Sequence, residues 1–189
     1  MFIQTEVTPN PQTLKFLPGK PVMESGTLDI RDAKGAGQSP LASALFAVDG
    51  VTGVFFGSDF VAVTKDAGEW QHLKPAILGA IMEHYLSNAP LLAADAQASA
   101  AAAESDSEFF EPGDAETVVT IKELLETRVR PAVAGDGGDI TFKGFKEGIV
   151  YLSMRGACAG CPSSTATLKH GIQNLLKHFL PDVRAVEQI

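Results

Sequence analysis

The sequence predicts an α+β protein built from two small domains. Three observations support this class: short apolar segments alternate with turn residues, longer segments carry apolar residues at helical spacing, and a middle segment has a composition of its own. The chain has 189 residues, of which 45% are hydrophobic and 20% are charged, as in ordinary globular proteins. That length is enough for one or two domains, each with its own core.

The middle segment, residues 89–113, is expected to be a flexible linker. It is rich in Ala and Ser, and residues 89–116 contain seven acidic residues and no Lys or Arg. Because like charges repel, the segment is expected to stay extended and solvated. An isolated Ala-rich helix is the alternative, but so few residues are only marginally helical without packing. We therefore predict domains at residues 1–88 and 114–189.

The first domain is predicted to contain five strands. Apolar residues alternate with polar ones or form short runs, and Pro, Gly, Asn and Asp close each run. The last two runs flank Gly57-Ser58-Asp59 and are expected to form a hairpin. The predicted strands cover residues 3–7, 14–17, 27–30, 51–56 and 60–64.

Two helices complete the first domain. Ser39 is a predicted N-cap, with Pro40 at the first helical position. The second helix covers residues 70–86 and carries His72 and His84, which lie twelve positions apart and are too distant to share one metal ion. We therefore expect this domain to serve binding or support and not catalysis. The apolar stripe of the second helix consists of Leu73, Ile77, Ile81 and Tyr85.

The second domain is predicted to combine two helices with a hairpin, in a small mixed sheet of the kind expected for both domains. A helix over residues 114–134 begins at Asp114 as N-cap, and strands at 140–142 and 149–154 follow. The Gly135-Asp136-Gly137-Gly138-Asp139 segment lacks the Lys-Ser/Thr of a phosphate loop, so we interpret it as a structural turn. The first helix carries an apolar stripe of Val118, Ile121, Leu125 and Val129, and the last one carries Leu168, Ile172, Leu175, Leu176 and Phe179.

Both cysteines of the chain, Cys158 and Cys161, form a C-x-x-C motif between a predicted strand and a predicted helix. A helix N-terminus favours a thiolate through its dipole and its free N–H groups. The neighbouring residues are small, so we expect both sulfurs to be accessible. Three interpretations remain open at this point: inert buried thiols, a redox dithiol of the thioredoxin type, or a metal or cluster site.

A metal or cluster site at this motif requires a second molecule. Tetrahedral zinc and most iron–sulfur clusters take four ligands, whereas the chain contains two cysteines. The simplest closure is a symmetric dimer in which two Cys158/Cys161 pairs face each other. Such a shared site suits a carrier that gives its cargo away. A zinc-bridged structural dimer is a further alternative.

Charge and composition exclude some functions and suggest a location. The net charge of −8 is concentrated in the middle segment, and neither domain is strongly basic, so nucleic-acid binding has no support. No apolar run reaches the roughly 18–20 residues of a membrane span. With no secretory or Arg-rich start and only two cysteines, the chain is expected in the bacterial cytoplasm, with a mature mitochondrial form as the alternative.

At the level of motifs, the chain resembles a known family. The 135–139 segment followed by Gly156-Ala157-Cys158-Ala159-Gly160-Cys161-Pro162-Ser163-Ser164 is similar to the NifU C-terminal (Nfu) domain of iron–sulfur scaffold proteins. Residues 4–11 and 15–19 are similar to the N-terminal domain of two-domain Nfu proteins. The resemblance covers both domains and leaves out the acidic linker.

The resemblance implies a scaffold or carrier and not an enzyme. It implies a [4Fe-4S] cluster, with [2Fe-2S] as the alternative, bound by Cys158 and Cys161 of two protomers in a cluster-loaded homodimer. An upstream donor scaffold would supply the cluster, and apo iron–sulfur client proteins would take it by thiolate ligand exchange. The competing function is a C-x-x-C dithiol oxidoreductase. No nucleic acid or membrane is expected as a partner.

Overall fold

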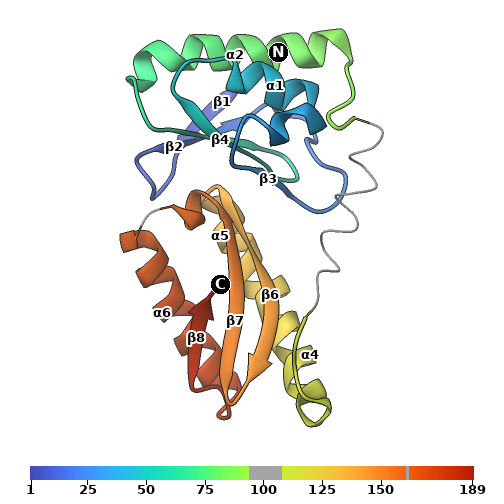
Figure 1. The fold of residues 1–189 in the computed structure, drawn as a ribbon, viewed down its shortest axis with the longest axis vertical. Helices are drawn as coiled ribbons and strands as arrows, with labels where there is room; N and C mark the ends of the chain where they lie inside the picture. The colour runs from blue at the N-terminus through green and yellow to red at the C-terminus, as the bar shows by residue number, and fades with distance from the viewer. Residues whose placement is uncertain (94–107, 161) are drawn as a thin grey trace. The chain divides into compact units, whose positions relative to one another are not determined.

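The computed structural model describes residues 1–93, 108–160 and 162–189, the side chains of 162–164 excepted. The chain forms two compact units, Met1–Glu104 and Ser105–Ile189 (Figure 1). Each unit contains one sheet and its own helices, so the predicted class of two α+β domains is confirmed. Among the described residues, no helix combines the length and the apolar character needed to cross a membrane.

The N-terminal unit contains a sheet of five strands in the order β1-β2-β5-β4-β3. All five predicted strands are present, but the expected mixed sheet is wrong for this unit. Every neighbouring pair is antiparallel. Short connections account for the β1–β2 and β4–β5 pairs, whereas β2–β5 and β3–β4 join strands that are distant in the sequence. The strands are β1 (Gln4–Val7), β2 (Thr13–Leu17), β3 (Leu28–Ile30), β4 (Val51–Phe56) and β5 (Val61–Lys65).

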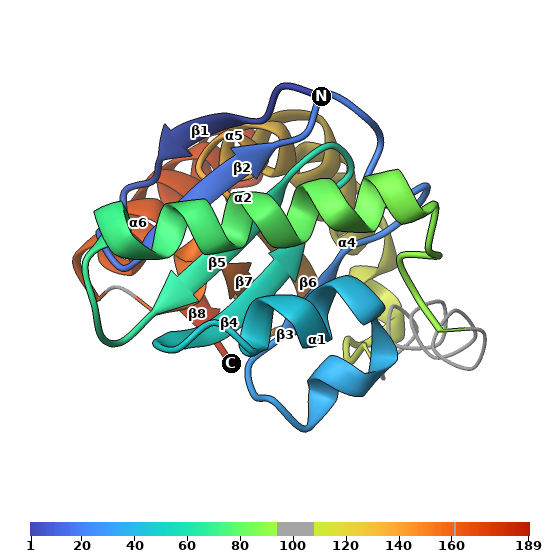
Figure 2. The same cartoon turned by 90° about the horizontal axis from the view of Figure 1, so that it is seen from above.

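Helices α1 (Pro40–Phe46) and α2 (Trp70–Ser87) pack on each other and cover one face of this sheet (Figure 2). The Ser39 hydroxyl accepts a hydrogen bond from the Ala42 N–H at 3.2 Å, which confirms the predicted N-cap. The apolar stripe of α2 faces the core, since Leu73, Ile77 and Ile81 are between 0% and 6% exposed. His84 joins this buried face.

Burial of His84 makes the N-terminal unit sensitive to acid. Desolvation lowers the pKa of His84 below its ordinary value of 6.5. The unfolded chain therefore takes up a proton near pH 6.5 that the folded unit resists, and the free energy of unfolding falls as the pH drops below 6.5. We expect a lower melting temperature at about pH 5 than at about pH 7.5, followed by Trp70 fluorescence. His84→Gln should flatten this dependence, whereas His72→Gln, at an exposed position, should leave it unchanged.

The C-terminal unit contains a mixed three-stranded sheet in the order β6-β7-β8. Strands β6 (Gly138–Lys146) and β7 (Ile149–Gly156) form the predicted hairpin, with Glu147 and Gly148 both at positive φ in the turn. Strand β8 (Ala185–Gln188) pairs parallel to β7 and was not predicted, because four residues carry too little pattern. The sheet is therefore mixed, as expected for this domain.

The predicted helix over residues 114–134 is interrupted in the structure. It consists of α4 (Ala115–Leu124), a π-helical turn (Leu125–Val129) and α5 (Arg130–Gly135). Pro131 explains the interruption, because proline has no N–H to continue the regular i→i−4 ladder. Asp114 occupies the N-cap position but makes no side-chain capping hydrogen bond. The predicted stripe is buried all the same, with Val118, Ile121, Leu125 and Val129 at most 5% exposed.

Both described ends of the predicted linker pack on their own units. Leu92 is buried in the N-terminal core, and the Ala93 N–H donates to the carbonyl of Gln38 at 2.8 Å. Phe109 forms a bridge to Gly144 beside β6, and its ring lies 5.1 Å from that of Tyr151. Residues 94–107 lie outside the described residues, so the flexible linker stays a prediction.

Candidate functional site

The glycine-rich segment 135–139 and the cysteine motif, which lie about twenty residues apart in the sequence, meet at one end of the C-terminal sheet. Gly138 at the start of β6 pairs with Gly156 at the end of β7. Next to this pair, the Ala157 N–H donates to the carbonyl of Gly137 at 3.1 Å. The glycine-rich turn therefore lies directly against the segment that carries Cys158. We interpreted this turn as structural, and its structural role is to support the cysteine segment.

Cys158 lies in a 3₁₀ turn, Ala157–Ala159, that follows β7. Gly156 directs the chain into this turn with φ 65°, a conformation that glycine adopts without strain. The thiol is 6% exposed and belongs to the hydrophobic core of the unit. A Cβ placed on Gly138 would lie 2.8 Å from the Cys158 sulfur, so only glycine allows this approach.

Helix α6 (Pro162–Phe179) begins directly after the cysteine motif. In its first turn, the Thr165 hydroxyl donates to the carbonyl of Cys158 at 2.9 Å and ties the 3₁₀ turn to the helix. Cys161 lies outside the described residues, so its place relative to Cys158 is not described. The assignment of Cys158 and Cys161 as a pair of ligands therefore stays a prediction.

The expectation of an accessible thiolate is wrong for Cys158. Burial, together with the nearby carboxylates of Asp136 and Asp139, raises the pKa of Cys158 to about 12, because both disfavour the anion. The small neighbours do not expose the sulfur, because Gly138 lets the opposite strand close over it. The resting thiol is neutral, which disfavours its use as the attacking nucleophile of a dithiol oxidoreductase. It is also what the interpretation as inert buried thiols predicts for this residue.

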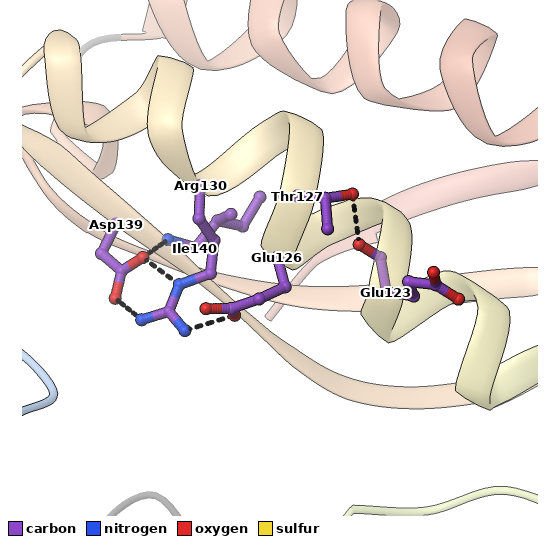
Figure 3. A network of polar contacts seen from close by, with 6 residues as sticks. All are labelled: Glu123, Glu126, Thr127, Arg130, Asp139 and Ile140. Carbon is purple, nitrogen blue, oxygen red and sulfur yellow. Dashed lines mark hydrogen bonds and ion pairs between the residues drawn. The ribbon is translucent and has the colours of Figure 1, made fainter.

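A polar network fixes the strand that contacts Cys158 (Figure 3). Arg130, the first residue of α5, donates to both carboxylate oxygens of Asp139, with each contact at 2.9 Å. Asp139 is 4% exposed, and one of its oxygens also accepts the Ile140 N–H at 2.8 Å. Arg130 donates in addition to Glu126 at 2.7 Å, on the exposed side of the helix. These contacts raise the pKa of Arg130 and keep its charge in place.

Sequence reasoning missed this network. Asp139 was named only as the last residue of the segment interpreted as a structural turn, and Arg130 was not singled out. The only sequence signal was Pro131, because a proline inside a predicted helix indicates an irregularity at that point. Such an irregularity can turn the side chain of the preceding residue, Arg130, away from the direction that regular helical spacing predicts. The ion pair joins Arg130 in a helix to Asp139 in a strand, nine positions later, and the apolar periodicity of the sequence does not predict such a pair.

The described residues do not complete a metal site. Within 1–93, 108–160 and 162–189, no group of three or more His, Cys, Asp or Glu side chains could hold a metal ion. Cys158 forms no disulfide and supplies one soft sulfur ligand. Because tetrahedral iron needs four ligands, a site at Cys158 must take the others from outside the described part of this chain.

Family models match both parts of the chain. Residues 3–88 match "Scaffold protein Nfu/NifU N terminal", and residues 121–187 match "NifU-like domain". The solution structure of a NifU-like protein from Saccharomyces cerevisiae aligns with 49% of this chain and 85% of its own, at 26% identity and a TM-score of 0.45.

Curated relatives align over the full chain. The "NifU-like protein 4, mitochondrial" and "NifU-like protein 5, mitochondrial" of Arabidopsis thaliana are each 56% identical over 100% of this chain, which covers 66% and 68% of them. The "NFU1 iron-sulfur cluster scaffold homolog, mitochondrial" of Homo sapiens is 49% identical over 100% of this chain, which covers 72% of it. The chain thus spans about two thirds of the length of these relatives.

These relatives correct one expectation and establish the family. The bacterial cytoplasm predicted from the sequence is wrong, since relatives at 49–56% identity over the full chain are named as mitochondrial proteins. The error arose because the prediction depended on the composition of the first residues, which does not specify a compartment. With both domains matched in order, the chain belongs to the Nfu family of NifU-like iron–sulfur cluster scaffold proteins.

Proposed function

We propose that this chain carries a [4Fe-4S] cluster between two protomers, each of which contributes Cys158 and Cys161. The observation that carries the proposal is the convergence of the Gly137-Gly138 turn on Cys158, in a family whose relatives are named as iron–sulfur cluster scaffolds. The chain contains two cysteines, so a cluster with four thiolate ligands needs a second copy.

Release of the cluster follows from the same arrangement. When Cys158 binds iron it loses its proton, and when the cluster leaves, the raised pKa of Cys158 returns it to the neutral thiol. The preference of the buried sulfur for its proton therefore weakens retention of the cluster. Client cysteines replace Cys158 and Cys161 of the two protomers one at a time: each Fe–S bond to the carrier is exchanged for an Fe–S bond to a client sulfur, and the proton that the client thiol loses is balanced by the one that the released cysteine takes up. In this proposal the protein is a carrier and not an enzyme.

The partners of this carrier are a cluster donor and apo iron–sulfur proteins. The relatives' names support a mitochondrial location for the exchange. The N-terminal unit lacks cysteine and would contribute by holding clients near the cluster, which raises their effective concentration. It contains the protein's only tryptophan, Trp70, which provides a specific signal for client contact.

Anaerobic reconstitution with iron and sulfide tests this function. The wild-type protein is expected to form a brown dimer with about four irons per two chains, and Cys158→Ser and Cys161→Ser should each lose both colour and dimer. Cys158→Ala, which keeps the buried position small, should behave in the same way. Its far-ultraviolet circular dichroism should match wild type, which separates a lost ligand from a lost fold.

Three results would contradict the proposal. A colourless monomer whose two thiols oxidise reversibly to a disulfide would support the dithiol oxidoreductase. A colourless zinc-bridged dimer that transfers nothing to an apo client would support a structural site. Retention of a stable cluster by Cys158→Ser would show that the ligand assignment is wrong.

A further inference from the structure

The N-terminal unit contains a pocket to which the carrier function assigns no role. Its volume is about 320 Å³, and it lies between the loop that follows β2 and the C-terminal end of α2. That volume falls within the range of small-ligand sites. The residues that give it chemical character are Lys20, Val22, His84, Tyr85, Asn88 and Leu91.

His84 is the buried polar group of this pocket. It is 8% exposed, and none of the described residues forms a hydrogen bond with its ring. No side-chain nitrogen or oxygen among the described residues is both sealed from solvent and unpartnered, so the ring nitrogens of His84 keep some contact with solvent, and His84 is one of the residues that line the pocket. Burial lowers the pKa of His84, and the neutral ring offers one donor and one acceptor.

Lys20 gives the pocket its charge. No acidic side chain lines the pocket, and no described residue forms an ion pair with Lys20. Its ammonium lies 5.9 Å from the centre of the Tyr85 ring, within the range of a cation–π contact. The Tyr85 hydroxyl makes only a long hydrogen bond of 3.4 Å to the Pro21 carbonyl, so it too can serve a ligand. The site therefore suits a single negative charge.

The apolar walls of the pocket and the C-terminal end of α2 further restrict which ligands the pocket can bind. Val22 and Leu91 offer aliphatic surface beside the polar groups, and both pack in or against the N-terminal core. Asn88 ends α2 in the left-handed conformation, with φ 51°, so the negative end of the helix dipole lies at the pocket. An anion is held there only because the full charge of Lys20 outweighs that partial charge.

We propose that this pocket binds a carboxylate that adjoins a short aliphatic group. Two sources share this chemistry: the C-terminus of a polypeptide that ends in an aliphatic residue, and a small free aliphatic acid. Lys20, Tyr85 and Asn88 donate to the carboxylate, and the aliphatic group contacts Val22 and Leu91. A polypeptide terminus has in addition an N–H beside its carboxylate, which matches the acceptor nitrogen of His84.

The test uses the full chain and three probes. Acetyl-Ala-Leu with a free carboxylate, its C-terminal amide, and 4-methylpentanoate are titrated while NMR follows the histidine ring signals. The free-acid peptide should shift His84 with saturation and leave His72, exposed on the same helix, in place. The amide should bind at least about tenfold more weakly, because it lacks the charge that Lys20 recognises.

Matched variants decide the result. Lys20→Gln should weaken binding of the free-acid peptide at least about tenfold, whereas Lys34→Gln, an exposed lysine outside the pocket, should not. If 4-methylpentanoate binds as well as the peptide, the source is a small acid; if the peptide binds tighter and His84→Gln removes that advantage, it is a polypeptide terminus. Equal binding of acid and amide, no effect of Lys20→Gln, or no saturation below about 10 mM would overturn the proposal. Cluster loading at Cys158 is independent of each of these outcomes.

Discussion

Gly138→Ala is expected to destabilise the C-terminal unit by about 2–3 kcal/mol. The added Cβ would lie 2.6 Å from the carbonyl oxygen of Arg155 and 2.8 Å from the sulfur of Cys158. The first of these atoms is backbone on the paired strand, so it cannot move aside without disturbing the β6–β7 ladder. Gly138 is not among the residues with positive φ, so the cost is steric and not conformational.

Thermal unfolding measures this effect unit by unit. Circular dichroism should show the transition of the C-terminal unit lowered by about 10–20 °C. Trp70 fluorescence, which reports on the N-terminal unit alone, should not change. Gly135→Ala is the matched control, because a Cβ at that position meets nothing within 4 Å. Equal melting temperatures for the two variants would show that the close approach to Cys158 does not exist.

A displaced sulfur should also react faster. In a Cys161→Ser background, Gly138→Ala is expected to increase the rate of Cys158 alkylation, since the added methyl group pushes the thiol away from the strand that covers it. With both cysteines present, Gly138→Ala should load less iron than the wild-type protein. An unchanged alkylation rate alongside a lowered melting temperature would place the strain at Arg155 and not at Cys158.

The local elements of this fold were predictable because local rules determine them. The Ser39-Pro40 start of α1, the buried stripe of α2 and the β6–β7 hairpin each depend on neighbouring residues. Strand β8 and the antiparallel order of the first sheet depend on partners far along the chain, which single-residue patterns do not encode. The sequence therefore predicted elements better than their pairing.

The chemistry of Cys158 was the least predictable feature of the site. The C-x-x-C spacing and the following helix indicated a reactive thiolate, since both features act within a few residues. Its raised pKa results from burial against Gly138 and from the carboxylates of Asp136 and Asp139. These groups lie about twenty positions away in sequence and approach only through the β6–β7 pairing. The pKa and burial of a site residue depend on tertiary contacts, so they are not predictable from local sequence even where the site residue itself is.

Arg130→Met is expected to cost the C-terminal unit about 2–3 kcal/mol, because it removes the guanidinium that donates two hydrogen bonds to the buried Asp139 carboxylate. The Asp139 side chain is 6% exposed, so water cannot replace the two lost hydrogen bonds. The Arg130 side chain is 32% exposed, so we expect a smaller loss of unfolding free energy than for a fully buried ion pair. Methionine keeps the apolar volume of the arginine stem, so the loss measures charge and hydrogen bonds and not packing.

Two further variants separate the buried ion pair from the surface one. Glu126→Gln removes a partner whose side chain is 66% exposed, and it should change stability by no more than about 0.5 kcal/mol. Adding Asp139→Asn to Arg130→Met should recover part of the loss, because the amide oxygen can still accept the Ile140 N–H without a buried charge. If Arg130→Met costs no more than Glu126→Gln, the Asp139 pair does not stabilise the fold.

Iron loading separates a role in stability from a role at the cysteine segment. If the double variant recovers stability but loads less iron than wild type, the Arg130–Asp139 pair supports the cysteine segment, since Asp139 directly follows Gly138, which contacts Cys158.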